Sequence, residues 1–411
     1  MRISPWLLAP LALPAIVACS RSSSSEAAPT ATTAAPIRTT ATDVGTVAMT
    51  ATAPPTTTSL AGPGGSAAGP TVSIPAGALI EGTPCGEQPR APGEELSGES
   101  MALTAFDIDA YPYPNDPAQP PRTGVTRDEA SKLCAARGRR LCTEVEWERA
   151  CKGPKNFRYE YGNRFDPKVC PTGLGAIASL GGSPECVSGF GVHAMHGYVW
   201  EWTASDWKRG KDEGKVVERG GHGNQPYAHM RCSNARAAVA SKGEASVGFR
   251  CCGGPANTAE VVIPADDPAP AALVEESLSE EGLTARLKRA LVNGSFKDPE
   301  GTTSTFTRIW RWHPAPKDEF ILVRYESKAS DGTRTVQPLV VRLCKDSVQL
   351  IGRLRGAVET MDNPVVKEDT PGTAVIKVGG GGSSDDVKLT YQYGQLTIAQ
   401  PAWLKESKAP K

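Results

Sequence analysis

Cysteine and histidine are the residues of this 411-residue chain whose number and spacing suggest chemistry. The chain contains 11 Cys, which is too many for a reducing cytosol unless the thiols bind metal or do redox work. Cys19 stands alone after an apolar run, and the remaining cysteines form an even set that suits disulfides in an oxidising compartment. His193, His196, His222 and His229 fall in one span, and clustered imidazoles can bind Zn²⁺ or Cu²⁺.

The start of the chain predicts the compartment. A positive charge at Arg2 precedes an apolar run from Trp6 to Val17, which has the length of a signal peptide and is too short to span a bilayer. The run ends in Ala18-Cys19-Ser20, which resembles a bacterial lipoprotein signal that is cut before a lipidated cysteine. We expect a signal peptide at 1–18, lipidation of Cys19 and a lipid-anchored position in the cell envelope. By the same resemblance, Ser20 favours the outer membrane, facing the periplasm or the surface. An ordinary secretory signal is the alternative.

Composition divides the rest of the chain into four segments. Residues 19–75 are rich in Ser, Thr, Ala and Pro and read as a disordered tether, because they cannot bury enough apolar surface to fold. A domain is expected at 76–253, a linker at 254–272 and a small α+β, β-rich domain at 273–405, which begins with a helix from about Ala272 to Asn293. The 45 basic and 45 acidic residues balance, which argues against nucleic acid as a partner.

Two short helices are predicted in the middle domain by their first turns. Thr126 with Glu129, and Thr143 with Glu146, have the spacing of capping boxes, in which each side chain satisfies a free backbone N–H. Cys134 and Cys151 then fall on the buried faces of the two helices, where we expect disulfide anchors more than reactive thiols. Cys170 and Cys186 flank a loop and are expected to pair with each other.

The same domain contains several short motifs in a fixed order. They are Phe106–Asp109, Gly138–Leu141, Glu146–Glu148, Met195–Trp202, Arg219–Gly221 and Gly248–Arg250. These motifs resemble the formylglycine-generating enzyme, or sulfatase-modifying factor, family. The fold that the resemblance implies is a compact α+β unit with sparse regular structure, related to C-type lectin domains. It also implies two disulfides, Cys134–Cys251 and Cys151–Cys232. Cys85, Cys142, Cys252 and Cys344 remain, and a Cys142–Cys252 pair is one way to join two of them.

The resemblance raises the question of copper chemistry. The enzymes of this family oxidise a sulfatase cysteine to formylglycine with O₂ and a copper(I) ion that two thiolates hold between the Arg-Gly-Gly motif and the last strand. In this chain residues 222–231 occupy that stretch and contain no cysteine. We therefore expect no copper cofactor and a non-catalytic binding or scaffolding module, whose partners are the membrane and an unidentified protein or glycan.

Three other readings of the domain stay open. The resemblance leaves a calcium site possible at Glu201, although Tyr198 stands where the family has an Asn ligand. His222 and His229 lie near the lost copper ligands, so an oxidoreductase with a His-based metal site is an alternative function. Carbohydrate or cell-wall binding through exposed Trp, at Trp200, Trp202 or Trp207, is a third, although core packing is the usual role of such residues.

Overall fold

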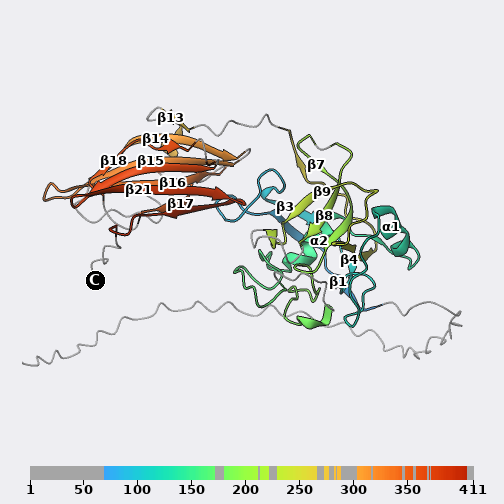
Figure 1. Cartoon of the computed structure of the whole chain (residues 1–411). Coiled ribbons are helices and arrows are strands. Elements are labelled where there is room, and N and C mark those ends of the chain that lie inside the picture. Colours follow the sequence, from blue (N-terminus) through green and yellow to red (C-terminus); the bar gives the residue numbers. More distant parts are fainter. Residues whose placement is uncertain are drawn as a thin grey trace, which may run out of the picture. The chain divides into compact units, whose positions relative to one another are not determined.

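The computed structural model describes residues 69–404 with several gaps. The gaps are 172–179, 212, 222–228, 266–272, 277–281, 284, 288–302, 316–317, 345–347, 355–357, 368–369 and 371. The predicted signal peptide, Cys19 and most of the predicted tether lie outside the described residues. Within the part that is described, no helix has the length and hydropathy needed to cross a membrane. The described chain forms two strand-rich parts, one coloured blue to yellow and one orange to red in Figure 1.

Short strands and two helices make up the first part, residues 69–265. One sheet has the order β1 (Thr71–Ile74), β4 (Phe106–Asp109), β11 (Cys251–Gly253), β5 (Arg140–Leu141), and a second has the order β10 (Val247–Phe249), β6 (Trp200–Asp206), β8 (Val216–Gly220), β9 (Ala235–Ala238). Two further pairs are β2 (Gly77–Gly82) with β3 (Ser97–Leu103), and β7 (Lys208–Arg209) with β12 (Val262–Ile263). A 3₁₀ turn spans Leu180–Gly182.

The paired strands extend on both sides of the predicted 76–253 domain. β1 lies in the segment predicted as tether, pairs antiparallel with β4 and buries Ile74 completely. β12 lies in the predicted linker and pairs with β7. Each of these strands is short and is flanked by a Pro- or Ala-rich sequence, so composition alone did not reveal it.

Both predicted helices form where their first turns place them. α1 (Arg127–Ala135) and α2 (Glu144–Lys152) each begin with a complete capping box, at Thr126 and at Thr143. Cys134 in α1 and Cys151 in α2 are fully buried. The helices therefore hold their cysteines against the sheets.

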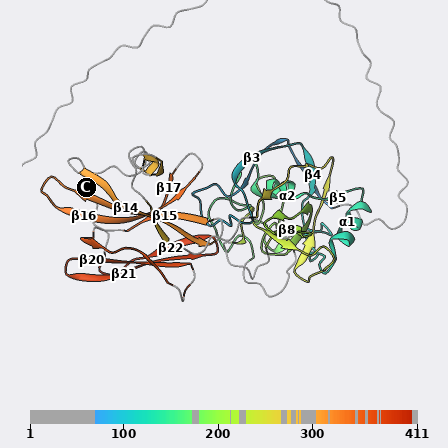
Figure 2. The same cartoon turned by 90° about the horizontal axis from the view of Figure 1, so that it is seen from above.

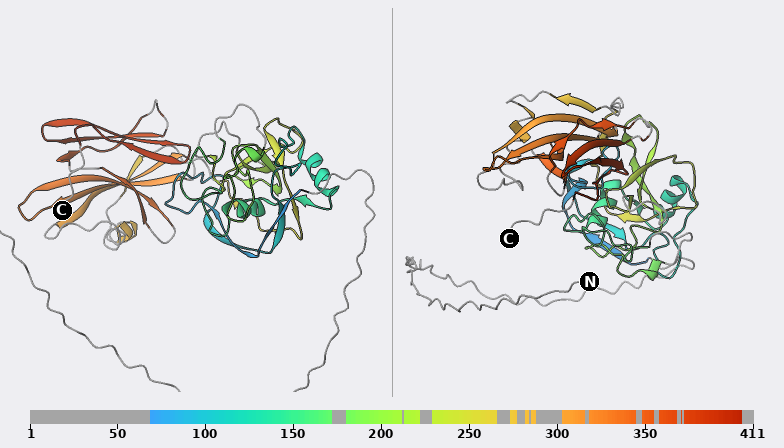
Figure 3. Two further views of the ribbon diagram at one scale, coloured as in Figure 1. Left: turned by 90° about the horizontal axis from the view of Figure 1, so that it is seen from below. Right: turned by 60° about the vertical axis from the view of Figure 1, so that its left-hand side comes forward.

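The second part, residues 273–404, consists of two sheets that lie as two layers in Figures 2 and 3. The first has the order β13 (Leu273–Glu276), β14 (Thr303–Ala315), β15 (Asp318–Lys328), β16 (Arg334–Leu343), β17 (Val348–Arg353). The second has the order β18 (Thr360–Met361), β20 (Thr373–Gly380), β21 (Ser383–Gln392), β22 (Gln395–Ala399), with β19 (Val365–Val366) beside β20. Alternate residues of β15 face opposite sides: Phe320 and Leu322 join the core between the sheets, whereas Ile321 and Val323 pack on the outer face.

The helix predicted from about Ala272 to Asn293 is corrected by this sheet. Leu273–Glu276 is the edge strand β13, which pairs with β14, and the described helical residues lie only between 283 and 287. Leu287 is fully buried on the outer face of the first sheet. Pairing with β14 outweighs the helical spacing of the Leu residues, which was the basis of the prediction. The fold as a whole is mostly β with few helices.

Candidate functional site

Five disulfides engage every cysteine of the described residues. Cys134–Cys251, Cys151–Cys232 and Cys170–Cys186 are the pairs expected from the sequence. Cys142 pairs with Cys252 across β11 and β5, and Cys85 pairs with Cys344 over a sequence separation of 259. No signal in the sequence singled out the last pair, because its members lie in two different parts of the chain.

This pairing decides whether the family's copper(I) site fits the chain. That site needs two free thiolates, which are the soft ligands that copper(I) prefers. Residues 222–231 contain no cysteine, and Cys232, the next residue, is bonded to Cys151. His222 lies outside the described residues. The donors that are present therefore do not fit the copper(I) site.

Glu201 is part of a buried ion pair. Its carboxylate accepts hydrogen bonds from Trp147 Nε1 at 2.8 Å and from Arg250 Nε and Nη2 at 2.7 and 2.8 Å. All three side chains are buried, and Tyr198, in the other proposed ligand position, is buried as well. The guanidinium and the indole contact both oxygens that a cation would need, so these contacts do not support the metal ligand at Glu201, which stays a prediction.

The three described histidines of the predicted cluster, His193, His196 and His229, have separate surroundings. His193 stacks on Tyr111 with ring centroids 4.7 Å apart, whereas His196 is buried next to Cys151. Burial lowers the pKa of His229, and the charge of Arg231 lowers it further. Among the described residues, no group of three ligand atoms close enough to hold one metal ion contains more than one histidine.

The three tryptophans proposed as a carbohydrate platform are core residues. Trp200, Trp202 and Trp207 are 3%, 1% and 8% exposed. Trp202 also donates its Nε1–H to the carbonyl of Val125 at 2.9 Å, and Trp207 stacks under the guanidinium of Arg209. The reading of these residues as exposed is wrong, since each fills space between short strands.

A buried network of charges holds the Arg-Gly-Gly motif. Arg219 Nη2 lies 2.8 Å from a Glu144 oxygen, 3.1 Å from a Glu148 oxygen and 3.5 Å from a Glu81 oxygen. Arg209 also pairs with Glu144. Burial, reinforced by the negative charge of Glu148, raises the pKa of Glu81 well above its usual value. These motif residues position one another, and Glu81 was missed because no local pattern marks it.

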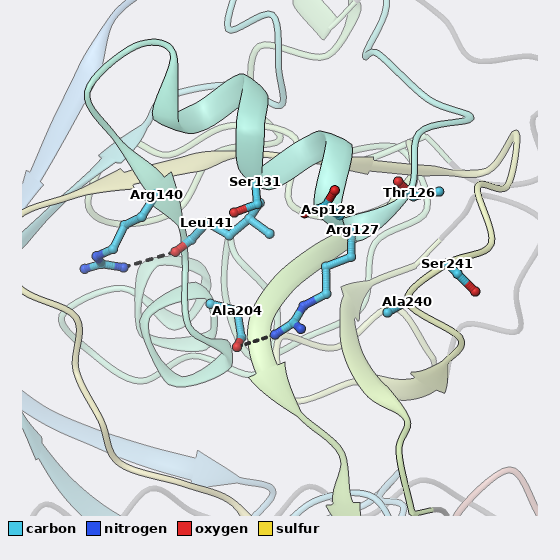
Figure 4. Close-up of a pocket in the computed structure, with 9 residues that line it drawn as sticks. All are labelled: Thr126, Arg127, Asp128, Ser131, Arg140, Leu141, Ala204, Ala240 and Ser241. Carbon is cyan, nitrogen blue, oxygen red and sulfur yellow. Dashed lines mark hydrogen bonds between the residues drawn. The ribbon is translucent and has the colours of Figure 1, made fainter.

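A pocket of about 620 Å³ opens beside the first turn of α1 (Figure 4). Figure 4 shows Arg127 and Arg140 on its walls, each with a hydrogen bond to a backbone carbonyl. Arg127 also lies 3.6 Å from Asp206, and Arg140 lies 2.7 Å from Glu146. Because both cations have acidic partners, the pocket is polar but carries no marked positive charge.

Comparison with known proteins shows which families and structures this chain is similar to. A family model described as "Sulfatase-modifying factor enzyme 1-like domain" matches residues 107–253. The inactive C-alpha-formylglycine-generating enzyme 2 of Mus musculus is 32% identical over 111 residues, which are 24% of this chain and 36% of that protein. The formylglycine-generating enzyme of Mus musculus is 29% identical over 160 residues, with 31% of this chain and 42% of that protein covered. The solved structure of PvdO from Pseudomonas aeruginosa is 20% identical, covers 44% of this chain and 93% of its own, and has a TM-score of 0.38.

The chain thus spans less than half the length of the curated relatives it matches. The match begins in β4 and ends in β11, so it contains both helices and the sheet around Glu201. With these motifs in place, residues 107–253 belong to the sulfatase-modifying factor enzyme 1-like family.

Proposed function

We propose that this chain is a lipid-anchored, extracytoplasmic protein whose sulfatase-modifying-factor-like domain is a non-catalytic binding or scaffolding module. One observation carries the proposal: every cysteine of the described domain is bridged, and residues 222–231 supply none. A domain without a thiolate pair has no ligands for the family's copper(I) ion. The similarity to an inactive formylglycine-generating enzyme 2 agrees with this view.

The anchor is proposed from the first twenty residues. The apolar run that ends at Ala18-Cys19 supports lipidation of Cys19 and a place in the outer membrane, facing the periplasm or the surface. Multiple disulfides suit such an oxidising compartment. The partners proposed are the membrane, through the lipid, and a protein or glycan bound by the folded parts.

Formylglycine formation is the activity to test. The purified full chain, loaded with copper(I), is incubated with O₂ and a peptide that carries a sulfatase-type cysteine motif, and the peptide mass is followed. We expect the peptide cysteine to stay unmodified, while an active formylglycine-generating enzyme converts it under the same conditions. Conversion by this chain at a comparable rate would refute the proposal.

Metal content separates the proposal from the His-based oxidoreductase. The chain is purified without chelators, and its copper, zinc and iron are measured against a His222→Ala/His229→Ala variant. Our proposal expects no stoichiometric transition metal in either protein. A full equivalent of metal in the native chain that the double variant loses would favour the oxidoreductase instead.

Lipidation has its own readout. Cells expressing the chain are grown with a radiolabelled fatty acid, and the Cys19→Ala variant serves as the matched control. We expect label in the native chain only. An unlabelled native chain would indicate an ordinary secretory signal and would leave the proposal about the folded domain intact.

A further inference from the structure

Two disulfides flank a buried histidine and a buried glutamate in the first part of the chain. His196 Nδ1 lies 3.8 Å from Cys151 Sγ, in the Cys151–Cys232 bridge, and 3.5 Å from Glu160 Oε2. On the other side, Glu160 Oε1 lies 2.7 Å from Cys170 Sγ and also contacts Cys186 Sγ. Glu160 is fully buried, and both sulfurs of the Cys170–Cys186 bridge belong to buried residues.

The two oxygens of Glu160 differ in their partners. Oε2 accepts the backbone N–H of Met195 at 2.9 Å and faces His196. Among the described residues, Oε1 contacts only the sulfurs of the bridge, and sulfurs in a disulfide carry no proton. A buried carboxylate oxygen without a donor is costly. This oxygen gains a partner when the sulfurs become thiols, or when a cation lies between it and two thiolates.

We propose that Cys170, Cys186 and Glu160 form a site for a thiophilic divalent cation such as Zn²⁺, which is available when the Cys170–Cys186 bridge is reduced. A dithiol reductant gives two electrons to the S–S bond, leaves two thiols and becomes its own cyclic disulfide. The cation then binds both sulfurs as thiolates and releases their two protons to solvent. The three ligand atoms lie within 4.8 Å of one another. Two thiolates and a carboxylate suit Zn²⁺, which leaves its fourth position for another ligand.

His196 is a positioning residue in this site. It faces the carboxylate oxygen that is turned away from the sulfurs, as outer-shell partners of metal-binding groups do. The neighbouring group of Cys151, His196 and Cys232 is a weaker candidate. Its bridge spans 81 residues, whereas Cys170–Cys186 spans 16 and constrains a much smaller loop.

Zinc uptake by the partly reduced chain tests the proposal. The full chain is treated with limiting dithiothreitol, desalted without oxygen, mixed with ZnCl₂ and assayed for bound zinc. We expect one zinc per chain after reduction and none before it. Glu160→Gln, which keeps the bridge, should weaken zinc binding about tenfold or more, since a ligand matters at least as much as an outer-shell partner. Glu185→Gln, an exposed neighbour of Cys186, is the matched control and should bind like the native chain.

Alkylation identifies the thiols that zinc protects. We expect zinc to shield Cys170 and Cys186 from iodoacetamide in the reduced chain, as read by mass mapping. Shielding of Cys151 and Cys232 instead, or native affinity in Glu160→Gln, would overturn the proposal. Glu160→Gln leaves both cysteines in place, so it tests the zinc site even if a Cys170→Ser/Cys186→Ser variant does not fold.

Discussion

At the scale of single residues, buried ion pairs set how the first part of the chain responds to pH. Burial by itself raises the pKa of Glu95. The charge of Arg231, together with hydrogen bonds from Arg231, Ser233 and the backbone of Ala91, lowers it to about 2. Because the folded-state pKa is below the usual value of 4.5, the pair stabilises the fold above that value. This stability is lost as the pH falls from about 4.5 towards 2.

Glu95→Gln should therefore lower stability at neutral pH and reduce its acid dependence. We expect a loss of about 3 kcal/mol at pH 7, since the variant removes the buried carboxylate that pairs with Arg231. Urea unfolding at neutral and acidic pH measures both effects. The exposed Glu99→Gln is the control. Equal pH dependence in Glu95→Gln and the native chain would contradict this account.

The pKa of Glu81 shifts in the opposite direction to the pKa of Glu95. Burial and the charge of Glu148 raise its folded-state pKa, so its contribution to stability is present below about 4.5 and is lost as the pH rises. Relative to the unfolded chain, the fold thus favours the neutral form of Glu81 over the charged form. We expect Glu81→Gln to keep the midpoint of thermal unfolding or raise it.

A comparison with Glu144, which also lies close to Arg219, tests the Glu81 prediction. Glu144→Gln removes the charge that faces both Arg209 and Arg219, so it should lower the midpoint by several degrees. Calorimetry of the two variants at neutral pH checks the order. An equal loss in both would contradict this account of Glu81.

At the scale of elements, disulfides stabilise strands that are too short to do so by themselves. β5 has two residues and β11 has three, yet Cys134–Cys251 and Cys142–Cys252 both bind β11 to its surroundings. The sheet thus depends on crosslinks that reduce the conformational freedom of the unfolded chain.

Removing one of these crosslinks should be costly. The Cys134–Cys251 bridge has a sequence separation of 117, so Cys134→Ser/Cys251→Ser should lose about 4 to 5 kcal/mol in the chain-entropy model. Cys170→Ser/Cys186→Ser, which opens a separation of 16, should lose about 3 kcal/mol. Denaturant unfolding of the two variants measures which of them loses more unfolding free energy. The reverse order would show that native strain, rather than loop length, governs these bridges.

At the scale of the whole molecule, Cys85–Cys344 links the two strand-rich parts covalently. A protease site inserted within residues 266–272 would cut the only main-chain connection between residues 265 and 273. On a non-reducing gel the cut chain should still run as one species, and on a reducing gel as two. Cys85→Ser/Cys344→Ser should give two species in both gels. Separation of the cut native chain without reductant would show that the bridge is absent.

The sequence by itself determined what depends on neighbouring residues and on ordered motifs. The capping boxes at Thr126 and Thr143 act within four residues, and the motifs from Phe106 to Arg250 identified the family and two of its disulfides. The lack of cysteine in residues 222–231 was also visible at once.

Only the tertiary structure decided what depends on partners far apart in the chain. The oxygens of Glu201 accept hydrogen bonds from Arg250, which is 49 residues away, and no local pattern predicts this ion pair. β13 formed because β14 offered it a strand edge, although its own residues favoured a helix. Cys85 and Cys344 carry no local signal at all. Burial, charge pairing and strand pairing are set by what the fold brings alongside each residue, and that information is spread over the whole chain.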